Sequence, residues 1–428
     1  MRPDRPPIEL TAGELTPKGP AAAEHAGRPY LLWGALPGER VLARPYKKGR
    51  EWYAAALEVL DRSPHRVETA EPHHLCCSPW QILSDELASL TKRRIASAAY
   101  RAAGHPVSAD ALELLSDPAR RYGYRNKMEY GFYADESGLF FSFFERHWKR
   151  KCPIDVCRLA EASLNTAALG VLGHLRAAGR QGRPYKTLLL RHDGSGNTIA
   201  SLYVTDGEWS LGHPEGVTGL AGFQVHHSDR RTPASVSHAE LYRWGTDTLE
   251  TPVLGRRLSY GVGSFFQINV PLFERALERM APYVETGRPL VDLYGGVGAI
   301  GVSLGQRAAS VTVVDSAAEA IEHAQRNLER HLPGRSRAEL GSAEKLLDHV
   351  TGEATLIVDP PRTGLHPEVV SRILSALPPR VIYLSCNVLT QARDYAALSS
   401  AYAVRELVLL DFFPNTPHIE SLLILERR

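Results

Sequence analysis

From about residue 256 onwards, apolar runs typical of buried strands alternate with helical stretches, and this alternation constrains the fold most. The expected strands are PLVDLY, SVTVVD, TLIVD, RVIYLS and ELVLLDFF, and the expected helices include IGVSLGQRA, SAAEAIEHAQRNLERH and HPEVVSRILSAL. Such alternation predicts a mostly parallel, doubly wound α/β sheet. Ligands of these sheets bind at the carboxyl ends of the strands, so the residues that follow each strand form the candidate site.

The rest of the chain follows a different pattern. A length of 428 residues suggests two to four domains, at roughly 100–200 residues each. Short β-type runs with turn signals over 28–70 predict a small antiparallel barrel of the oligonucleotide-binding type, although any small β-barrel fits the pattern. We therefore expect a barrel over 1–70, an α+β central domain over 71–255 and the doubly wound domain over 256–428. The helical region near 84–115 is expected to pack on the last of these.

Charge and hydropathy narrow the class of partner. Lys and Arg number 50 against 48 Asp and Glu, but basic residues cluster in the N-terminal half. The clusters are Lys47, Lys48 and Arg50; Lys92, Arg93 and Arg94; and Arg146, Lys149, Arg150 and Lys151. Each alone is typical of a solvated face, but three together favour a polyanionic partner. Because no apolar run approaches the roughly 20 residues of a membrane span, and no signal peptide is evident, we expect a cytoplasmic protein without a membrane partner.

A glycine-rich turn marks the candidate cofactor site. The segment Asp292–Gly298, DLYGGVG, follows an apolar run and precedes a helix, and glycines there allow the backbone to approach a ligand. Asp315 ends the next strand about twenty residues later, where a carboxylate can accept the ribose hydroxyls of an adenosine. The spacing lacks the G-x-G-x-x-G of a dinucleotide site, so S-adenosylmethionine fits better than NAD. The alternative for Asp315 is a solvated strand end.

Three later segments also follow apolar strands and should meet at the same edge of the sheet. They are DPPRTGL at 359–365, SCN at 385–387 and FPNTPHIE at 413–420. A cysteine there, with a carboxylate nearby, can act as a nucleophile with a base. Alone, Cys386 would more often be a small buried hydrophobe.

Together with YRNK at 124–127 and GSFFQIN at 263–269, these motifs resemble, in this order, the uracil-C5 RNA methyltransferases that make 5-methyluridine. The resemblance implies a class I S-adenosylmethionine-dependent methyltransferase domain and a TRAM-like N-terminal barrel that binds RNA. It assigns Cys386 as nucleophile and Glu420 as base. The residues that it places around the cofactor are Gln267, Tyr294, Gly295, Asp315 and Asp359.

The expected chemistry places demands on these side chains. Addition of a thiolate to carbon 6 of uracil makes carbon 5 nucleophilic, and a base must later remove the proton from carbon 5. We therefore expect a neighbour that lowers the pKa of Cys386 below about 8.5. Phe265 and Phe266 either assist flipping of the target base or belong to the core. The candidate contacts to RNA, with internal ion pairs as the alternative, are Arg125, Lys127 and Arg362.

One segment departs from the family's pattern. Many members hold a four-iron cluster through C-x5-C-G-G-C and a distant fourth cysteine, but here the segment reads HHLCCSPWQ at 73–81. The cysteines available are Cys76, Cys77, Cys152 and Cys157. Their spacing does not fit the family's cluster, so we expect no iron–sulfur cluster. A nonstandard cluster, or a zinc site that uses His73 or His74, is the alternative.

The resemblance, with its TRAM-like barrel, implies an enzyme that methylates a uridine of 23S-type ribosomal RNA, with transfer RNA as the alternative substrate. We expect the enzyme to be monomeric. An amino-group methyltransferase is disfavoured because its Asn/Asp-Pro-Pro-Tyr/Phe motif would place an aromatic residue where Arg362 stands. The last alternative is an RNA-binding protein that retains a methyltransferase domain without catalysis.

Overall fold

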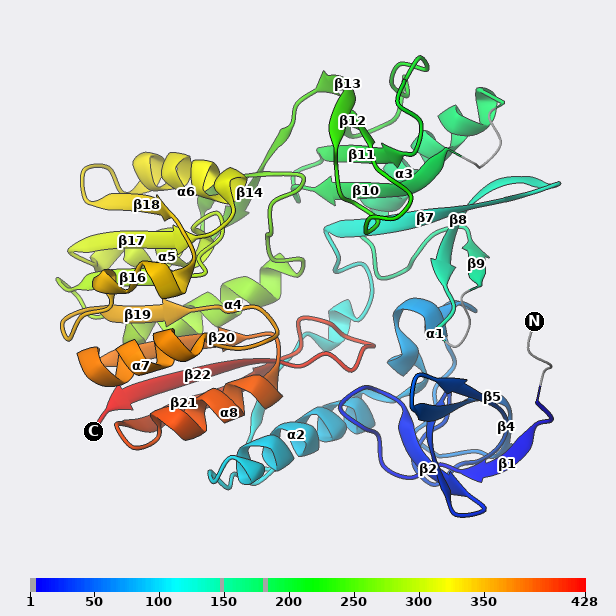
Figure 1. The fold of residues 1–428 in the computed structure, drawn as a ribbon, viewed down its shortest axis with the longest axis horizontal. Helices are drawn as coiled ribbons and strands as arrows, with labels where there is room; N and C mark the ends of the chain where they lie inside the picture. The colour runs from blue at the N-terminus through cyan, green and yellow to red at the C-terminus, as the bar shows by residue number, and fades with distance from the viewer. Residues whose placement is uncertain (1–4, 147–149, 180–183) are drawn as a thin grey trace.

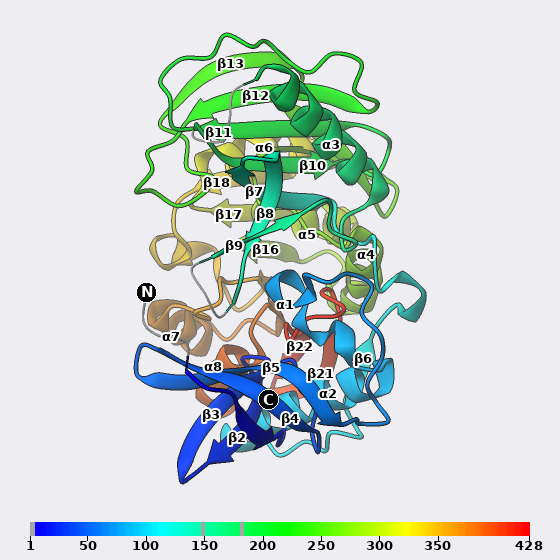
Figure 2. The ribbon, with the colours of Figure 1, turned by 90° about the vertical axis from the view of Figure 1, so that its right-hand side faces the viewer.

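The computed structural model describes residues 5–146, 150–179 and 184–428. These residues form three larger sheets and one two-stranded sheet (Figure 1). Figure 1 shows the C-terminal sheet, from yellow to red, beside the green central sheet and the blue N-terminal sheet. In the turned view of Figure 2 the N-terminal strands and β10–β13 lie at opposite ends of the molecule. No helix among the described residues is long and apolar enough to cross a membrane.

The N-terminal sheet has five strands in the order β1-β4-β5-β3-β2. They are β1 (Ile8–Thr11), β2 (Ala21–His25), β3 (Arg28–Trp33), β4 (Arg40–Lys48) and β5 (Glu51–Asp61). The chain after β1 hydrogen-bonds to β2, with Gly13 N donating to Ala22 O at 2.7 Å, so the sheet closes on itself as a small barrel. Arg66 and the buried Glu39 pair at 2.6 Å next to it.

A helical segment connects this barrel to the C-terminal sheet. It contains α1 (His74–Cys77), a 3₁₀ turn (Pro79–Ile82), α2 (Asp85–Ala102) and β6 (Glu113–Leu115). The Ser84 hydroxyl accepts a hydrogen bond from Leu87 N at 3.3 Å, and acidic residues occupy the first turn, which explains why α2 starts there. The helix packs on α8 through a 2.8 Å hydrogen bond from Tyr100 to Gln391. Strand β6 pairs with β21, so part of the segment that we assigned to the central domain extends the C-terminal sheet.

The central sheet has seven strands in the order β13-β12-β11-β10-β7-β8-β9, and α3 packs on it. Its elements are β7 (Lys127–Asp135), β8 (Gly138–Phe144), β9 (Lys151–Ile154), α3 (Ala162–Ala177), β10 (Tyr185–His192), β11 (Thr198–Val204), β12 (Leu220–His227) and β13 (Ala239–Gly245). A two-stranded ribbon of β14 (Thr248–Val253) and β15 (Arg256–Gly261) leads into the C-terminal region.

The C-terminal sheet has the order β18-β17-β16-β19-β20-β22-β21-β6. Its remaining strands are β16 (Pro289–Leu293), β17 (Ser310–Asp315), β18 (Ser336–Leu340), β19 (Thr355–Val358), β20 (Arg380–Ser385), β21 (Tyr402–Leu410) and β22 (Glu420–Arg427). The helices are α4 (Val270–Met280), α5 (Ala299–Leu304), α6 (Ala318–His331), α7 (Pro367–Ala376) and α8 (Val388–Leu398). Helices α2, α7 and α8 contribute to one core cluster, and α4, α5 and α6 to the other, so both faces of the sheet are covered.

The predicted α/β class is confirmed, and the five expected strands are present. The strand pattern missed β18, whose residues are largely exposed or half-buried, and β22. Strand β22 inserts between β20 and β21 and is antiparallel to both. Because it runs the opposite way, its first residue, Glu420, lies at the edge where the parallel strands end.

Candidate active site

A cavity of about 650 Å³ opens at the carboxyl edge of the C-terminal sheet. Its walls come from the ends of parallel strands, from the loop before α4 and from the turn between β21 and β22. The expected site residues that line it are Gln267, Tyr294, Asp315, Asp359, Arg362, Cys386 and Glu420. Segments far apart in the sequence therefore meet at one place.

The glycine-rich turn between β16 and α5 forms one wall. Tyr294 and Gly296 have positive φ angles of 61° and 55°, which tighten the turn. A Cβ atom on Gly295 would lie 2.7 Å from Val313 Cγ1, so this glycine allows the turn to pack against β17. Gly296, rather than the expected Gly295, lines the cavity.

Asp315 is held at the end of β17 by two backbone donors. Gly296 N donates to Oδ2 and Ala317 N donates to Oδ1, each at 2.9 Å. A carboxylate oxygen has further lone pairs, so both oxygens keep acceptor capacity toward the cavity. With the amide of Gln267 in the same cavity, this donor and acceptor set fits ribose hydroxyls. These residues fit S-adenosylmethionine.

Sequence reasoning missed the role of Asp292, although it begins the DLYGGVG motif. Its side chain is fully buried, and Oδ2 accepts a hydrogen bond from Gly301 N at 2.8 Å. Oδ1 has no hydrogen-bond partner among the described residues. Burial raises the pKa of Asp292 to about 7, against the Gly301 hydrogen bond. The carboxyl group ties the start of α5 to the strand beneath the turn.

Cys386 and Glu420 are the candidate reacting pair. Cys386 follows β20 and Glu420 begins β22, and these two strands are neighbours. Burial raises the pKa of Glu420 to about 7, and the Arg362 guanidinium opposes this shift. A base with a pKa near 7 is available in its ionised form at neutral pH and still holds a proton well.

The prediction that a neighbour lowers the pKa of Cys386 below its ordinary value is wrong for this structure. Burial raises the pKa of the thiol to about 11, and the Glu420 and Asp359 carboxylates act in the same direction. Arg362 opposes them. Sequence spacing could not show this balance, because it depends on which carboxylates face the thiol.

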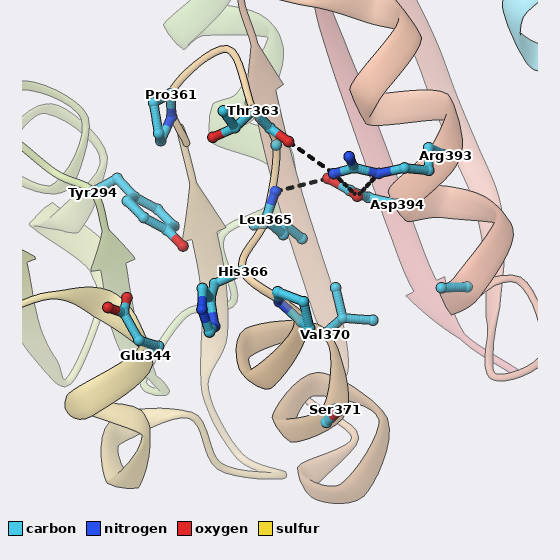
Figure 3. Close-up of a pocket in the computed structure, with 13 residues that line it drawn as sticks. Tyr294, Glu344, Pro361, Thr363, Leu365, His366, Val370, Ser371, Arg393 and Asp394 are labelled. Atoms are coloured by element: carbon cyan, nitrogen blue, oxygen red, sulfur yellow. Dashed lines mark hydrogen bonds and ion pairs between the residues drawn. The ribbon is translucent and has the colours of Figure 1, made fainter.

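Asn387, which precedes α8, and Asp394 within α8 hold the loop that carries Arg362. Asn387 donates through Nδ2 to Arg362 O at 3.0 Å and accepts from Leu389 N at 3.1 Å, so it also begins the helix. Asp394 accepts from Leu365 N at 2.8 Å, as Figure 3 shows, and from the Tyr383 hydroxyl at 2.8 Å. The sequence gave no signal for Asp394, which resembles an ordinary polar residue on a helix.

Figure 3 also shows a second cavity, of about 770 Å³, next to this loop. It shares Tyr294, Glu344 and Pro361 with the first cavity. The Arg393 guanidinium donates to Thr363 O at 2.8 Å and pairs with Asp394. The loop therefore separates two cavities and is tied down from α8.

The turn between β21 and β22 is anchored from the N-terminal half of the chain. The Tyr124 hydroxyl donates to Pro414 O at 3.1 Å. Asn415 exchanges hydrogen bonds with Arg121 at 2.6 and 2.8 Å and accepts from Trp80 N at 3.1 Å. Because this turn leads directly to Glu420, these contacts determine where that carboxyl group stands.

The loop before α4 is anchored in the same way. Asn126 donates through Nδ2 to Gln267 O at 3.0 Å. Phe265 is 66% exposed and lines the cavity, whereas Phe266 is 2% exposed and stacks on Tyr260 at 4.2 Å between ring centres. The two interpretations of these phenylalanines therefore apply to different residues. Phe266 belongs to the core, whereas Phe265 is exposed where a substrate could contact it.

The three candidate RNA contacts differ in position. Arg362 lines the cavity, and the Arg125 guanidinium lies 5.8 Å from the centre of the Phe413 ring, which also lines it. Lys127 of β7 pairs with Arg191 of the neighbouring strand β10 and does not line the cavity. Burial lowers the pKa of His418 to about 4, and among nearby cations Arg362 contributes most. Positive charge therefore gathers beside the cavity.

Lys92 of the second basic cluster does not lie on a solvated face. Lys92 is 1% exposed and pairs with Asp411 at 2.6 Å. Arg94 lies 3.5 Å from Glu14. In the third cluster, Lys149 lies outside the described residues. The basic clusters in the sequence therefore suggested more free positive surface than the structure has, because some of their side chains form ion pairs within the chain.

The four remaining cysteines form two groups. Cys77 and Cys157 lie 3.5 and 3.9 Å from Glu71 Oε1. Cys76 lies beside Cys152. All five cysteines are free thiols.

Comparison with known families gives one match to a family model. Residues 246–428 match the model described as tRNA (uracil-5-)-methyltransferase. This region contains every cavity-lining residue named above.

Related proteins match over between half and almost all of the chain. An RNA methyltransferase of Nitratidesulfovibrio vulgaris is 28% identical, over 98% of this chain and 96% of that protein. One from Streptococcus mutans is 31% identical, over 57% of this chain and 55% of its own length. The crystal structure of Pyrococcus abyssi tRNA (uracil-54, C5)-methyltransferase with S-adenosyl-L-homocysteine has a TM-score of 0.79 and 24% identity. It covers 98% of this chain and 100% of its own, which shows a shared fold.

Proposed function

We propose that this chain is an RNA uracil-C5 methyltransferase, which transfers a methyl group to carbon 5 of a uridine in RNA through a covalent cysteine adduct. The observation that carries the proposal is the single cavity lined by Cys386, Glu420 and Asp315. With these side chains in one cavity, a nucleophile and a base for the uracil would lie beside an acceptor for the ribose of the cofactor.

Five residues would hold the cofactor. Asp315 would accept the ribose hydroxyls, and the remaining four would surround the rest of the molecule: Gln267, Tyr294, Gly295 and Asp359. Gly295 would contribute by allowing the close packing of its turn. When bound, S-adenosylmethionine supplies an electrophilic methyl group.

Cys386 would add to carbon 6 of the uracil. A bond forms between sulfur and carbon 6, and the electron pair of the ring double bond moves toward the carbonyl, which makes carbon 5 nucleophilic. The thiolate is the reactive form, and burial disfavours it here. Arg362 is the cation that favours it, so we assign Arg362 the role of supporting thiolate formation as well as contacting RNA.

Glu420 would remove the proton from carbon 5 after methylation. The electrons of that C–H bond restore the ring double bond and release the Cys386 thiolate. With a pKa raised to about 7, Glu420 is a stronger base than an exposed carboxylate, yet it is largely ionised above pH 7. Phe265 would stack on the displaced base, because it is exposed beside this pair.

We propose large ribosomal RNA as the substrate. Support comes from the N-terminal barrel, which we interpret as a TRAM-like RNA-binding domain. It borders the catalytic turn, since Trp80 donates to Gly19 O at 2.9 Å and also contacts Asn415. The activity would be cytoplasmic and the enzyme monomeric.

Transfer RNA is the second candidate. The matching family model and the Pyrococcus abyssi protein are both named for tRNA, which supports it. A protein that only binds RNA would not need a nucleophile and a base in its cavity. Here Cys386 and Glu420 both line the cavity, which supports catalysis.

The test is methylation in vitro. Purified protein, S-adenosylmethionine and RNA from a strain lacking the gene are incubated, and 5-methyluridine is mapped in ribosomal and transfer RNA by mass spectrometry. We expect wild type and the control Cys152→Ala to methylate one class of RNA, and Cys386→Ala to be inactive. Turnover by Cys386→Ala would contradict the mechanism, and methylation confined to transfer RNA would replace the ribosomal assignment.

A further inference from the structure

Four side chains that can bind metal converge away from the catalytic cavity. They are Glu71, His73, Cys77 and Cys157, and their nearest ligand atoms all lie within 4.8 Å of one another. Three come from the short segment around α1, and Cys157 follows β9 in the central region. Residues 86 positions apart are thus brought together by folding.

The distances between these ligand atoms suit a single ion. His73 Nε2 lies 3.3 Å from Glu71 Oε2, and the Cys77 and Cys157 sulfur atoms lie 3.5 and 3.9 Å from Oε1. A tetrahedron with Zn–N and Zn–O bonds of about 2.0–2.2 Å and Zn–S bonds of about 2.3 Å has edges of about 3.3–3.8 Å. The protein therefore already presents ligands close to the spacing that zinc requires.

The burial of the group calls for a positive charge. Glu71 is 5% exposed, and its charged neighbour among the described ion pairs is His73. His73 Nε2 is buried, and its contact with Glu71 Oε2 at 3.3 Å does not have hydrogen-bond geometry in the described part of the chain. A buried carboxylate beside two thiols and an imidazole is costly unless positive charge compensates it. A divalent ion would compensate the carboxylate and accept the lone pair of the imidazole nitrogen at once.

Neighbouring groups orient these ligands, as is common around bound metals. Glu71 accepts from Arg158 N at 2.8 Å and from Gln81 Nε2 at 3.1 Å. Gln81 also donates to the Ser78 hydroxyl at 2.6 Å, which lies 3.1 Å from the Cys77 sulfur. The carboxylate and one thiol are thus held in place by the same amide.

The same geometry does not fit the four-iron cluster that the resemblance implies. Such a cluster takes four cysteine thiolates, each on a different iron. Here only Cys77 and Cys157 belong to the group, and Cys76 lies with Cys152 instead. Ligand atoms within 4.8 Å of one another surround one ion rather than the corners of a cluster.

We propose that Glu71, His73, Cys77 and Cys157 bind one Zn²⁺ ion as a closed structural site. The ion joins the α1 segment to the central region. That segment continues into the 3₁₀ turn whose Trp80 contacts Asn415 of the catalytic turn. The site therefore stabilises the packing between the N-terminal half and the active-site edge, without taking part in methyl transfer.

The test measures metal content and metal binding on the full-length protein. Wild type, Cys77→Ser and the matched control Cys76→Ser are purified anaerobically without chelators, and zinc, iron and sulfide are quantified. We expect about one zinc per chain in wild type and Cys76→Ser, and loss of it in Cys77→Ser. Cys76 is the adjacent, half-buried thiol of the same helix, so it controls for loss of a sulfur atom at this place.

A second measurement does not depend on how the variant folds. Metal is removed from wild type with a chelator, and Co²⁺ is titrated back while the visible spectrum is recorded. We expect one equivalent to give the intense absorption of tetrahedral Co²⁺ with thiolate ligands, and Zn²⁺ to displace it. Absence of both zinc and cobalt binding would overturn the proposal, as would more than about three irons with matching sulfide per chain.

Discussion

Within residues 5–146, 150–179 and 184–428, two pairs of a cysteine and a glutamate differ in their access to solvent and in their other neighbours. Cys386 and Glu420 face a cavity and share it with Asp359 and Arg362. Cys77 and Glu71 lie 3.5 Å apart in a closed group that lines none of the cavities described above. The same two residue types therefore suit a covalent reaction where a substrate can enter, and suit metal binding where a histidine and a second thiol complete the set.

The largest expected effect is on the methylation rate, and it should distinguish Glu420 from Glu71. Glu420→Gln removes the base and should slow release of methylated RNA by about 10²- to 10⁴-fold, because general base catalysis contributes that much. Glu71→Gln should instead weaken metal retention. Single-turnover and steady-state methylation rates, with zinc content measured on both variants, check this pair. Equal turnover by Glu420→Gln and wild type would contradict the role of Glu420 as the base.

Removal of zinc should destabilise the protein but leave the cavity's residues in place. An ion present at 100 to 1,000 times its dissociation constant stabilises the folded state by about 3–4 kcal/mol. We expect chelation to lower the thermal midpoint of wild type and of Cys76→Ser, and to have no effect on Cys77→Ser. A midpoint that is unchanged in wild type would count against a structural ion.

Asp394 should stabilise the loop that separates the two cavities. Asp394→Ala leaves Leu365 N and the Tyr383 hydroxyl without their acceptor, so we expect a loss of about 1–3 kcal/mol in the free energy of unfolding. Ser371→Ala, an exposed residue of the neighbouring cavity, is the control. Urea denaturation measures both. Equal stability of the two variants would show that the loop is held by other contacts.

The smallest expected effect concerns the reactivity of Cys386 with pH. The pKa of its thiol is about 11, so alkylation should accelerate as pH rises from neutral toward that value. Glu420→Gln removes a negative neighbour and should lower the midpoint by about one pH unit, whereas Arg362→Gln should raise it. Alkylation of the peptide that contains Cys386, followed by mass spectrometry, measures the midpoint. Shifts of the same sign would contradict the assigned electrostatics.

The pH dependence of methylation follows from the same groups. Glu420, the base in our proposal, is mostly protonated below its pKa of about 7 and mostly ionised above it. The thiolate fraction of Cys386 also increases with pH and reaches one half only near its pKa of about 11. We therefore expect the rate to rise from acidic to alkaline pH. A rate that falls above pH 7 while the protein stays folded would disagree with these assignments.

Sequence reasoning predicted that residues such as Asp315, Asp359 and Cys386 lie close together, because parallel strands end at one edge of the sheet, and these residues do line one cavity. It could not predict Asp394, which acts from within a helix, or the raised pKa of Cys386, which depends on neighbouring carboxylates. It also could not find Glu71, because nothing in the sequence links it to Cys157. The roles assigned to the cavity residues remain predictions.

The most direct test of the central claim is denaturing gel electrophoresis of the enzyme with labelled RNA and S-adenosylmethionine. We expect a covalent RNA–protein band that accumulates for Glu420→Gln, because the adduct forms but cannot be resolved, and that is absent for the double variant Cys386→Ala with Glu420→Gln. A band that persists in the double variant, or methylated RNA released by Cys386→Ala, would contradict the account.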